Sequence, residues 1–328
     1  MYDEKRELLI YLVSVFAITF LTGIPLAYSY YNGLSVDVFP LVQMLYPAAC
    51  VMLTYMIVRK GDLMIPQKRY TFYLGVVSLA IIAMIMGTVL KINVNGLIES
   101  ALVIIGFIFI FLILKVEDKE KAREYGLRGS MKGWIKYSLI FILFYIASLF
   151  LEEFFSGNIS EMMQVLSTDT FKKVFSMILI PITFLFQIMI FFGEEYGWRY
   201  FLQGRLQNMT GKRVGVILTG IIWGLWHMPL NFFYYMDPEY GLIGMASYQI
   251  GCITGGIFLA YVFMKTKNIW VVSIIHCINN MMTPIIYGMN STSSRSPSWG
   301  GVVASLVANV LVFGIILFAK EFRKEESI

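Results

Sequence analysis

The chain has 328 residues, of which 58% are hydrophobic and only 14% are charged. Soluble globular domains carry about 25% charged residues, so this composition excludes an ordinary soluble domain. The formal net charge of +5 has a topological explanation, given below, and does not indicate a nucleic-acid partner.

Apolar segments recur along the whole chain, each close to the roughly 20 residues that a transmembrane helix needs. A transmembrane barrel would instead show weak alternation over short segments. The sequence therefore predicts an all-α fold, a polytopic transmembrane helix bundle of about ten spans. The first span is too long, and lacks the small-residue cleavage site, for a removable signal peptide. The predicted spans are 8–30, 39–58, 71–90, 97–115, 134–151, 181–206, 213–231, 243–264, 269–289 and 301–319.

The basic residues indicate the topology of these spans. With the N-terminus in the cytoplasm, all but four of the 26 Lys and Arg residues fall on the inner side. Because Lys and Arg accumulate in cytoplasmic loops, this bias predicts a multi-pass protein of the cell membrane with both termini in the cytoplasm. The four basic residues left outside are Lys91, Lys172, Lys173 and Arg295.

The ionisable residues divide the chain into three parts of one bundle. Residues 1–170 have almost no such residues inside their spans and are predicted to be an N-terminal scaffold. Residues 171–290 hold the unusual polar groups and form the predicted working core, and residues 291–328 form an outer loop, a last helix and a cytoplasmic tail. We also expect an outer loop at Glu152–Lys173, with Glu152 and Glu153 as solvated span-end residues. Gly251 and Gly255 form a GxxxG pattern, which predicts close helix packing.

Three elements of the core place ionisable groups inside apolar spans. Glu194 lies in the sixth span, and the only two histidines, His227 and His276, lie in the seventh and ninth. Such groups are costly in a bilayer, so each is a candidate functional residue. A helix rise of 1.5 Å per residue puts Glu194, His227, His276 and Asn280 about 18, 21, 11 and 17 Å from the cytoplasmic end. The similar depths predict one pocket below the inner membrane face.

The spacing around the glutamates suggests a division of roles. Glu195 and Arg199 are four residues apart and share one helix face, which predicts an ion pair that supports the structure. Glu194 is rotated about 100° away and has no such partner in its own helix. We therefore expect Glu194 to be free to act as a general base or acid.

The histidines complete this polar group from two other spans. His276 and Asn280 are also four residues apart, so both can donate hydrogen bonds to one developing oxyanion. Asn279 is a weaker competitor for this place. His227 stands alone on its span, with Trp223 one turn before it, and Trp198, Trp223 and Trp226 are expected to be packing residues.

Metal and thiol chemistry are the alternatives to a glutamate mechanism. Two histidines and a glutamate can bind zinc and leave a position open for water. The sequence lacks HExxH, so no helix supplies two ligands four residues apart. No cofactor is assigned, and a divalent metal such as zinc stays open. Cys50, Cys252 and Cys277 all lie in apolar segments and are expected to pack there without a disulfide framework.

These residues form three motifs that occur together in a known family. EExxxR stands at Glu194–Arg199, an aromatic-xxx-His motif at Trp223–His227, and HxxxN at His276–Asn280. Over about residues 191–280, a quarter of the chain, the sequence resembles the CAAX protease and bacteriocin-processing family, also called the Abi family. These intramembrane proteases include the Ras-converting CAAX endopeptidases, and the EEYGWR variant is similar to the bacterial branch.

The resemblance implies a role for each motif residue. Glu194 and His227 would activate the attacking water, His276 and Asn280 would form the oxyanion hole, and Glu195 with Arg199 would support the fold. The family has been described both as metalloproteases and with a metal-free glutamate mechanism. We therefore expect an intramembrane endopeptidase that opens toward the cytoplasm and cleaves a peptide or a membrane-protein substrate.

Two other functions are compatible with the same sequence. One is a non-catalytic membrane scaffold for bacteriocin immunity or signalling, which would bind a membrane signalling partner. The other is a proton-coupled transporter, because buried Glu and His residues can relay protons. Polar residues along a whole pathway would favour the transporter, and the spans hold few beyond Gln187 and Gln249. The oligomeric state stays open.

Overall fold

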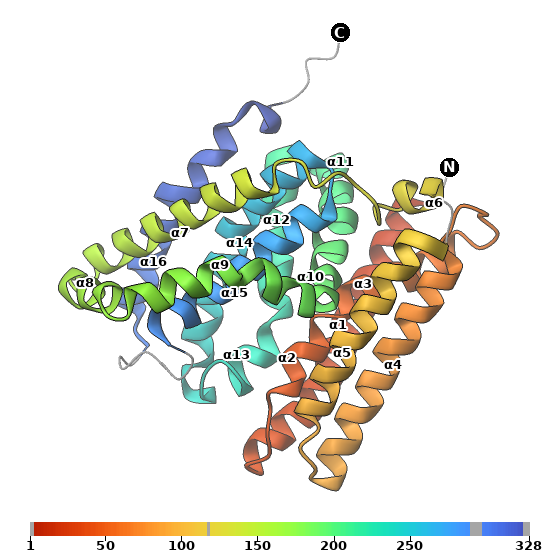
Figure 1. Cartoon of the computed structure of the whole chain (residues 1–328), viewed down its shortest axis with the longest axis horizontal. Helices are drawn as coiled ribbons and strands as arrows, with labels where there is room; N and C mark the ends of the chain where they lie inside the picture. Colours follow the sequence, from red (N-terminus) through yellow and green to blue (C-terminus); the bar gives the residue numbers. More distant parts are fainter. Residues whose placement is uncertain (1–2, 117–118, 289–296, 324–328) are drawn as a thin grey trace.

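The computed structural model describes residues 3–116, 119–288 and 297–323 (Figure 1). Within these residues every regular element is a helix. Eight helices are long and apolar enough to cross a membrane, or nine if one bent pair is counted as a single span. The predicted all-α, polytopic helix bundle is confirmed, and the chain is a multi-pass membrane protein.

The helical segments are, in chain order, α1 (Glu4–Tyr31), α2 (Val38–Gln43), α3 (Tyr46–Val58), α4 (Gln67–Leu90), α5 (Asn95–Phe111), η1 (Leu112–Val116), α6 (Lys119–Glu124), α7 (Trp134–Phe155), α8 (Ile159–Ser167), α9 (Thr170–Phe186), α10 (Ile188–Glu195), η2 (Tyr196–Gln203), α11 (Gly204–Thr210), α12 (Lys212–Trp226), α13 (Met228–Phe233), η3 (Pro238–Tyr240), α14 (Gly241–Thr266), α15 (Ile269–Tyr287), α16 (Trp299–Phe313), η4 (Gly314–Phe318) and η5 (Lys320–Phe322). Helices α1 to α5 lie together on one side of the molecule, and α7 to α9 lie on the other with α16 (Figure 1). Helices α10 to α12 lie between these groups, and α12 packs chiefly on α14.

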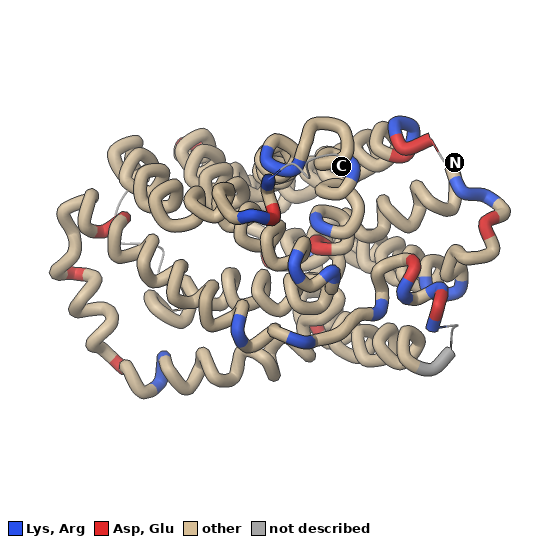
Figure 2. Tube along the Cα trace, turned by 90° about the horizontal axis from the view of Figure 1, so that it is seen from above, with Lys and Arg blue, Asp and Glu red and all other residues tan. Residues whose placement is uncertain are grey.

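One end of the molecule gathers segments that carry basic residues, among them Lys5 in α1, Lys121 in α6, Arg205 in α11 and Lys320 in η5. The start of α1, helices α6 and α11, and η5 lie at this end (Figure 1). Figure 2 views the molecule from that end and shows Lys and Arg spread over its turns. Under the positive-inside rule this end would face the cytoplasm.

The predicted sixth span is bent. Helix α9 ends at Phe186, and the segment Ile188–Thr210 continues at an angle of 79° to it. Gln187 lies between them with a backbone outside the helical range, φ −110° and ψ 16°. Both arms are apolar, so hydropathy alone gives no sign of the bend. The predicted helix at 181–206 is therefore wrong in its boundaries.

The predicted seventh span is interrupted at His227. Helix α12 has 15 residues and ends at Trp226, and the six-residue α13 follows after His227. Pro229 lies in the first turn of α13, where its missing N–H costs no hydrogen bond. Neither helix reaches the length of a full span, so the structure supports eight or nine spans where the sequence predicted ten.

The structure tests one of the two predicted outer loops, the one at Glu152–Lys173. Within Glu152–Lys173 the structure places α8 and the first turn of α9, so this stretch is largely helical. Glu152 and Glu153 belong to the last turns of α7 and are half-buried, not solvated. The loop predicted from residue 291 falls, up to residue 296, outside the described residues, as does the tail from residue 324.

A buried ionic cluster joins α1 to the core. The Glu7 side chain of α1 is fully buried, and its Oε1 accepts a hydrogen bond from Arg59 Nε at 2.6 Å. Its Oε2 pairs with Arg205 of α11. Tyr11, one turn along α1, packs its ring 6.0 Å from Trp198 and 4.7 Å from Phe201. The first helix is therefore fastened to the segment that carries the glutamates.

The close contact between α12 and α14 does not use the predicted glycines. A Cβ added at Gly251 or Gly255 would meet no atom within 4 Å. A Cβ at Gly220 of α12 would lie only 2.6 Å from the Cα of Ile253. Gly220 and Gly224 form their own GxxxG pattern, and it is Gly220 that lets the two backbones approach.

We expect Gly220→Val to destabilise the bundle, because the new side chain would force α12 and α14 apart. Overpacking of this kind costs about 1–3 kcal/mol. Gly251→Val is the matched control, since its Cβ would enter open space. Thermal unfolding of both variants in detergent measures the difference, and equal melting temperatures would contradict this assignment of the helix contact.

Candidate functional site

The two glutamates lie in the most buried stretch of the chain. Every residue from 188 to 199 is buried, and Glu194 and Glu195 are 2% and 0% exposed. A Cβ at Gly193 would lie 2.3 Å from the Met44 carbonyl oxygen, and one at Gly197 would lie 2.3 Å from the Pro47 side chain. These glycines therefore let the segment Met44–Pro47, which leads into α3, pack closely against the helical turn that carries the glutamates. The helix widens into a π-helix at Tyr196, a distortion often found at functional sites.

Glu194 is held by two tryptophans. Its Oε2 accepts hydrogen bonds from Trp198 Nε1 at 3.2 Å and from Trp223 Nε1 at 2.7 Å. Trp198 is four residues further along the same helical segment, so Glu194 has a hydrogen-bond partner there, although the ion pairs of the described residues give it no ion-pair partner in that segment. The four-residue spacing of Glu194 and Trp198 could have indicated this hydrogen bond. It was missed because tryptophans in apolar spans were interpreted as packing residues. Neither indole donates a hydrogen bond to the other carboxylate oxygen of Glu194, Oε1.

Glu195 bridges two other site residues. Its Oε2 accepts from Arg199 Nε at 3.1 Å, which gives the ion pair that the spacing predicted. Its Oε1 lies 2.8 Å from His276 Nδ1 on α15, a contact that the sequence did not indicate. Glu195 therefore fixes the orientation of His276 as well as pairing with Arg199.

The ion pair with Glu195 engages only the Nε atom of the Arg199 guanidinium group. Within the described chain, its Nη1 and Nη2 atoms are buried without a hydrogen-bond partner. The guanidinium carbon lies 4.7 Å from the centre of the Trp223 ring, in the geometry of a cation–π contact. Arg199 thus supports the indole that binds Glu194.

His227 has a defined tautomer. Its Nδ1 lies 2.9 Å from the carbonyl oxygen of Trp223. A carbonyl only accepts hydrogen bonds, so Nδ1 carries the proton and the neutral ring keeps a lone pair on Nε2. Tyr248 covers the ring at a centroid distance of 4.6 Å, and Cys252 Sγ lies 3.9 Å from Nδ1. All three cysteines are free and buried, as predicted.

His276 and Asn280 differ in their surroundings. The His276 ring is 3% exposed and lies edge-on to Phe191 at a centroid distance of 5.3 Å. Asn280 is half-buried, and its Oδ1 accepts a hydrogen bond from Asn279 Nδ2 at 3.1 Å. Asn279, expected to compete with Asn280, instead orients its carboxamide so that the Asn280 Nδ2 group is left to donate.

Trp223 is the centre of the arrangement. Its indole N–H binds Glu194, and its carbonyl binds His227. Its ring lies 5.3 Å from the ring of His276, besides its contact with Arg199. Carboxylate, guanidinium and both imidazoles therefore meet around one side chain that the sequence marked only as the aromatic member of a motif.

The candidate donor side chains are not gathered into a metal site in the described part of the chain. Among the described residues, no group of three or more His, Cys, Asp or Glu side chains is placed to hold an ion. The contacts of both Nδ1 atoms and of Glu194 Oε2 leave His227 Nε2, His276 Nε2 and Glu194 Oε1 as the atoms that could bind a metal. Because these side chains are not gathered into such a group, we derive no step through a metal.

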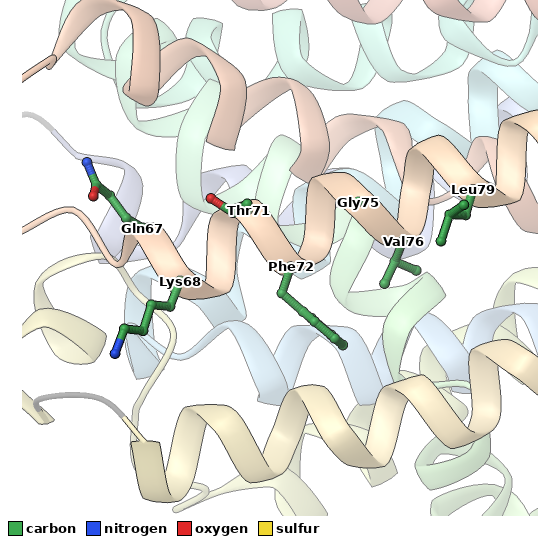
Figure 3. Close-up of a pocket in the computed structure, with 7 residues that line it drawn as sticks. All are labelled: Gln67, Lys68, Thr71, Phe72, Gly75, Val76 and Leu79. Atoms are coloured by element: carbon green, nitrogen blue, oxygen red, sulfur yellow. The ribbon is translucent and has the colours of Figure 1, made fainter.

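A cavity of about 610 Å³ lies away from these residues. It runs along α4, and Lys68, Phe72 and Val76 project from the same side of that helix (Figure 3). None of the predicted site residues lines it. The cavity therefore belongs to the scaffold half of the bundle.

The segment that carries the candidate site residues is similar to known proteins. Residues 175–282 match the family described as type II CAAX prenyl endopeptidase Rce1-like. A CAAX prenyl protease 2 from Methanococcus maripaludis is 28% identical over 145 residues, which cover 42% of this chain and 50% of the relative. The match thus spans half of that relative's length. No solved structure matches the chain.

Proposed function

Because the chain belongs to the CAAX protease family, we propose that it is an intramembrane endopeptidase that hydrolyses a peptide bond of a peptide or membrane-protein substrate. The observation that carries the proposal is the meeting of Glu194, His227 and His276, from three separate segments, around the Trp223 indole. Two histidines and a carboxylate buried together in apolar surroundings suit the activation of water.

The proposed reaction begins with a water molecule between Glu194 and His227. Glu194 Oε1 takes one proton from the water while His227 Nε2 accepts a hydrogen bond from the other. The water oxygen forms a bond to the carbonyl carbon, and the electron pair of the C=O bond moves to its oxygen. His276 Nε2–H and Asn280 Nδ2–H donate to this oxyanion. The C–N bond then breaks as Glu194 returns the proton to the leaving nitrogen.

Glu195 prepares His276 for this role. Donation from Nε2 to an oxyanion requires a proton on that nitrogen, while Nδ1 faces the Glu195 carboxylate. A ring between two negative oxygens carries a proton on each nitrogen. Glu195 is thus proposed as a positioning residue for His276 in addition to its pairing with Arg199.

The experiment that tests the function compares membranes that contain the wild-type protein with membranes that contain Glu194→Gln. New N-termini that appear only with the wild type would identify cleaved substrates and the cleaved bond. If immunity or signalling phenotypes persist in both while the sets of N-termini are identical, the non-catalytic scaffold is the correct function.

Trp223→Phe is expected to lower kcat about 10–100-fold, because it removes the N–H bound to Glu194. It also replaces the indole with a smaller aromatic ring, a loss of volume that the control variant shares. A hydrogen bond to a charged group contributes about 1.5–3 kcal/mol, and about 1.36 kcal/mol is a tenfold change in rate. Trp226→Phe is the matched control: this tryptophan is equally buried, and its Nε1 has no hydrogen-bond partner in the described chain. Equal effects of the two variants on peptide hydrolysis would contradict the role of Trp223.

A further inference from the structure

Helix α15 carries a polar stripe that leads away from His276. Asn280, Thr283 and Tyr287 follow at steps of four, three and four residues, so they share one helix face with the histidine. Exposure rises from buried His276 through half-buried Asn280 to exposed Thr283, and Tyr287 at the end of the stripe is half-buried. The candidate site is thus closed at His276 but continues into an accessible row of polar groups.

Helix α7 faces this stripe with polar groups of its own. Tyr145 Oη lies 2.7 Å from Thr283 Oγ1, and Tyr287 Oη donates to Glu153 Oε1 at 3.3 Å. Both helices are candidate membrane spans. We call these residues the polar seam, which consists of Tyr145, Glu153, Asn279, Asn280, Thr283 and Tyr287.

Helix–helix hydrogen bonding alone does not account for the polar seam. Polar residues that only join helices are buried between them, whereas Thr283 is exposed and Asn280 and Tyr287 are half-buried. The face of α7 that meets lipid is apolar in contrast, with Leu139 and Leu143 62% and 65% exposed. Accessible polar side chains within spans mark water-filled or substrate-binding surfaces.

We propose that the polar seam binds an extended segment of the polypeptide substrate and places the peptide bond to be cleaved next to His276 and Asn280. The seam leads away from the basic end of the molecule, so this substrate segment would approach from the side opposite to the cytoplasmic opening that the sequence predicted. This inference rests on the proposed proteolytic function. Inside a bilayer every backbone N–H and C=O needs a partner, and carboxamides and hydroxyls supply both donors and acceptors. The seven residue steps from Asn280 to Tyr287 span about 10 Å of helix, which matches about three extended substrate residues.

Thiol labelling in nanodiscs tests whether the polar seam is open to water. In a background with Cys50, Cys252 and Cys277 replaced by alanine, Thr283→Cys is compared with Leu143→Cys, which lies on the lipid face of α7. The probe is a cationic methanethiosulfonate reagent. We expect it to modify position 283 at least tenfold faster than position 143, and equal rates would overturn the proposal.

Occupancy is tested in the same two variants with Glu194→Gln added, so that nothing is cleaved. Saturating β-casein, an unfolded polypeptide, should slow labelling at position 283 at least fivefold and leave position 143 unchanged. Fast labelling that β-casein does not slow would overturn peptide binding. Labelling rates need no catalysis, so the two proposals can fail separately. Protection of position 283 without hydrolysis by the wild type would contradict only the proposed function. Hydrolysis by the wild type without protection would contradict only the binding of substrate at the polar seam.

Discussion

Glu194→Gln is expected to lower the rate of peptide-bond hydrolysis about 10²–10⁴-fold, the range that general acid–base catalysis contributes. The amide cannot take a proton from water, yet it keeps an oxygen that can accept the hydrogen bonds of Trp198 and Trp223. The fold should therefore survive, and the loss should fall on kcat rather than on KM. Single-turnover hydrolysis by purified protein, with thermal unfolding measured in parallel, separates the two effects.

Glu99→Gln is the control for this variant, because Glu99 is an exposed glutamate on α5. It should match the wild type in hydrolysis and in melting temperature. If Glu194→Gln cleaves as fast as Glu99→Gln, the carboxylate takes no part in the reaction and the proposed mechanism is wrong.

Glu195→Gln is expected to impair both stability and hydrolysis. Removing one partner of a buried ion pair costs about 3–5 kcal/mol, because the other charge stays buried and unpaired, and here that charge is Arg199. His276 would lose its carboxylate partner as well, with a fall in kcat of about 10²–10³-fold, as for the loss of one oxyanion donor. Unfolding in detergent and hydrolysis at a temperature where the variant is folded measure these effects separately.

The double variant Glu195→Gln/Arg199→Met distinguishes the two roles of Glu195. Removing both charges should restore part of the lost stability, since no unpaired guanidinium remains. Hydrolysis should stay low, because His276 still lacks its partner. A double variant that regains full activity would show that Glu195 acts only through Arg199.

The sequence singles out the residues that the structure brings together better than it predicts the contacts between them. The cost of placing Glu194, His227 and His276 in apolar segments is a property of each residue, so composition and position were enough to single them out. The i,i+4 rule gave the Glu195–Arg199 pair for the same reason, since it depends only on local helix geometry.

Contacts between segments could not be predicted in this way. The hydrogen bond from Trp223 to Glu194 and that between His276 and Glu195 join residues 29 and 81 positions apart. Nor does hydropathy reveal the bend at Gln187 or the break at His227, because the chain is apolar on both sides of each. The packing glycine was misassigned to Gly251 for a similar reason: the GxxxG pattern occurs on both helices, and only their contact shows which one is used.

The ionic cluster at Glu7 has a consequence for dissecting the protein. The stretch that matches the family, residues 175–282, contains Arg205 but neither Glu7 nor Tyr11. Excised from the chain, it would bare a guanidinium and an aromatic surface that α1 normally covers. The matched stretch is therefore not expected to fold by itself as it does in the whole chain, because its glutamate-bearing segment packs against the first helix.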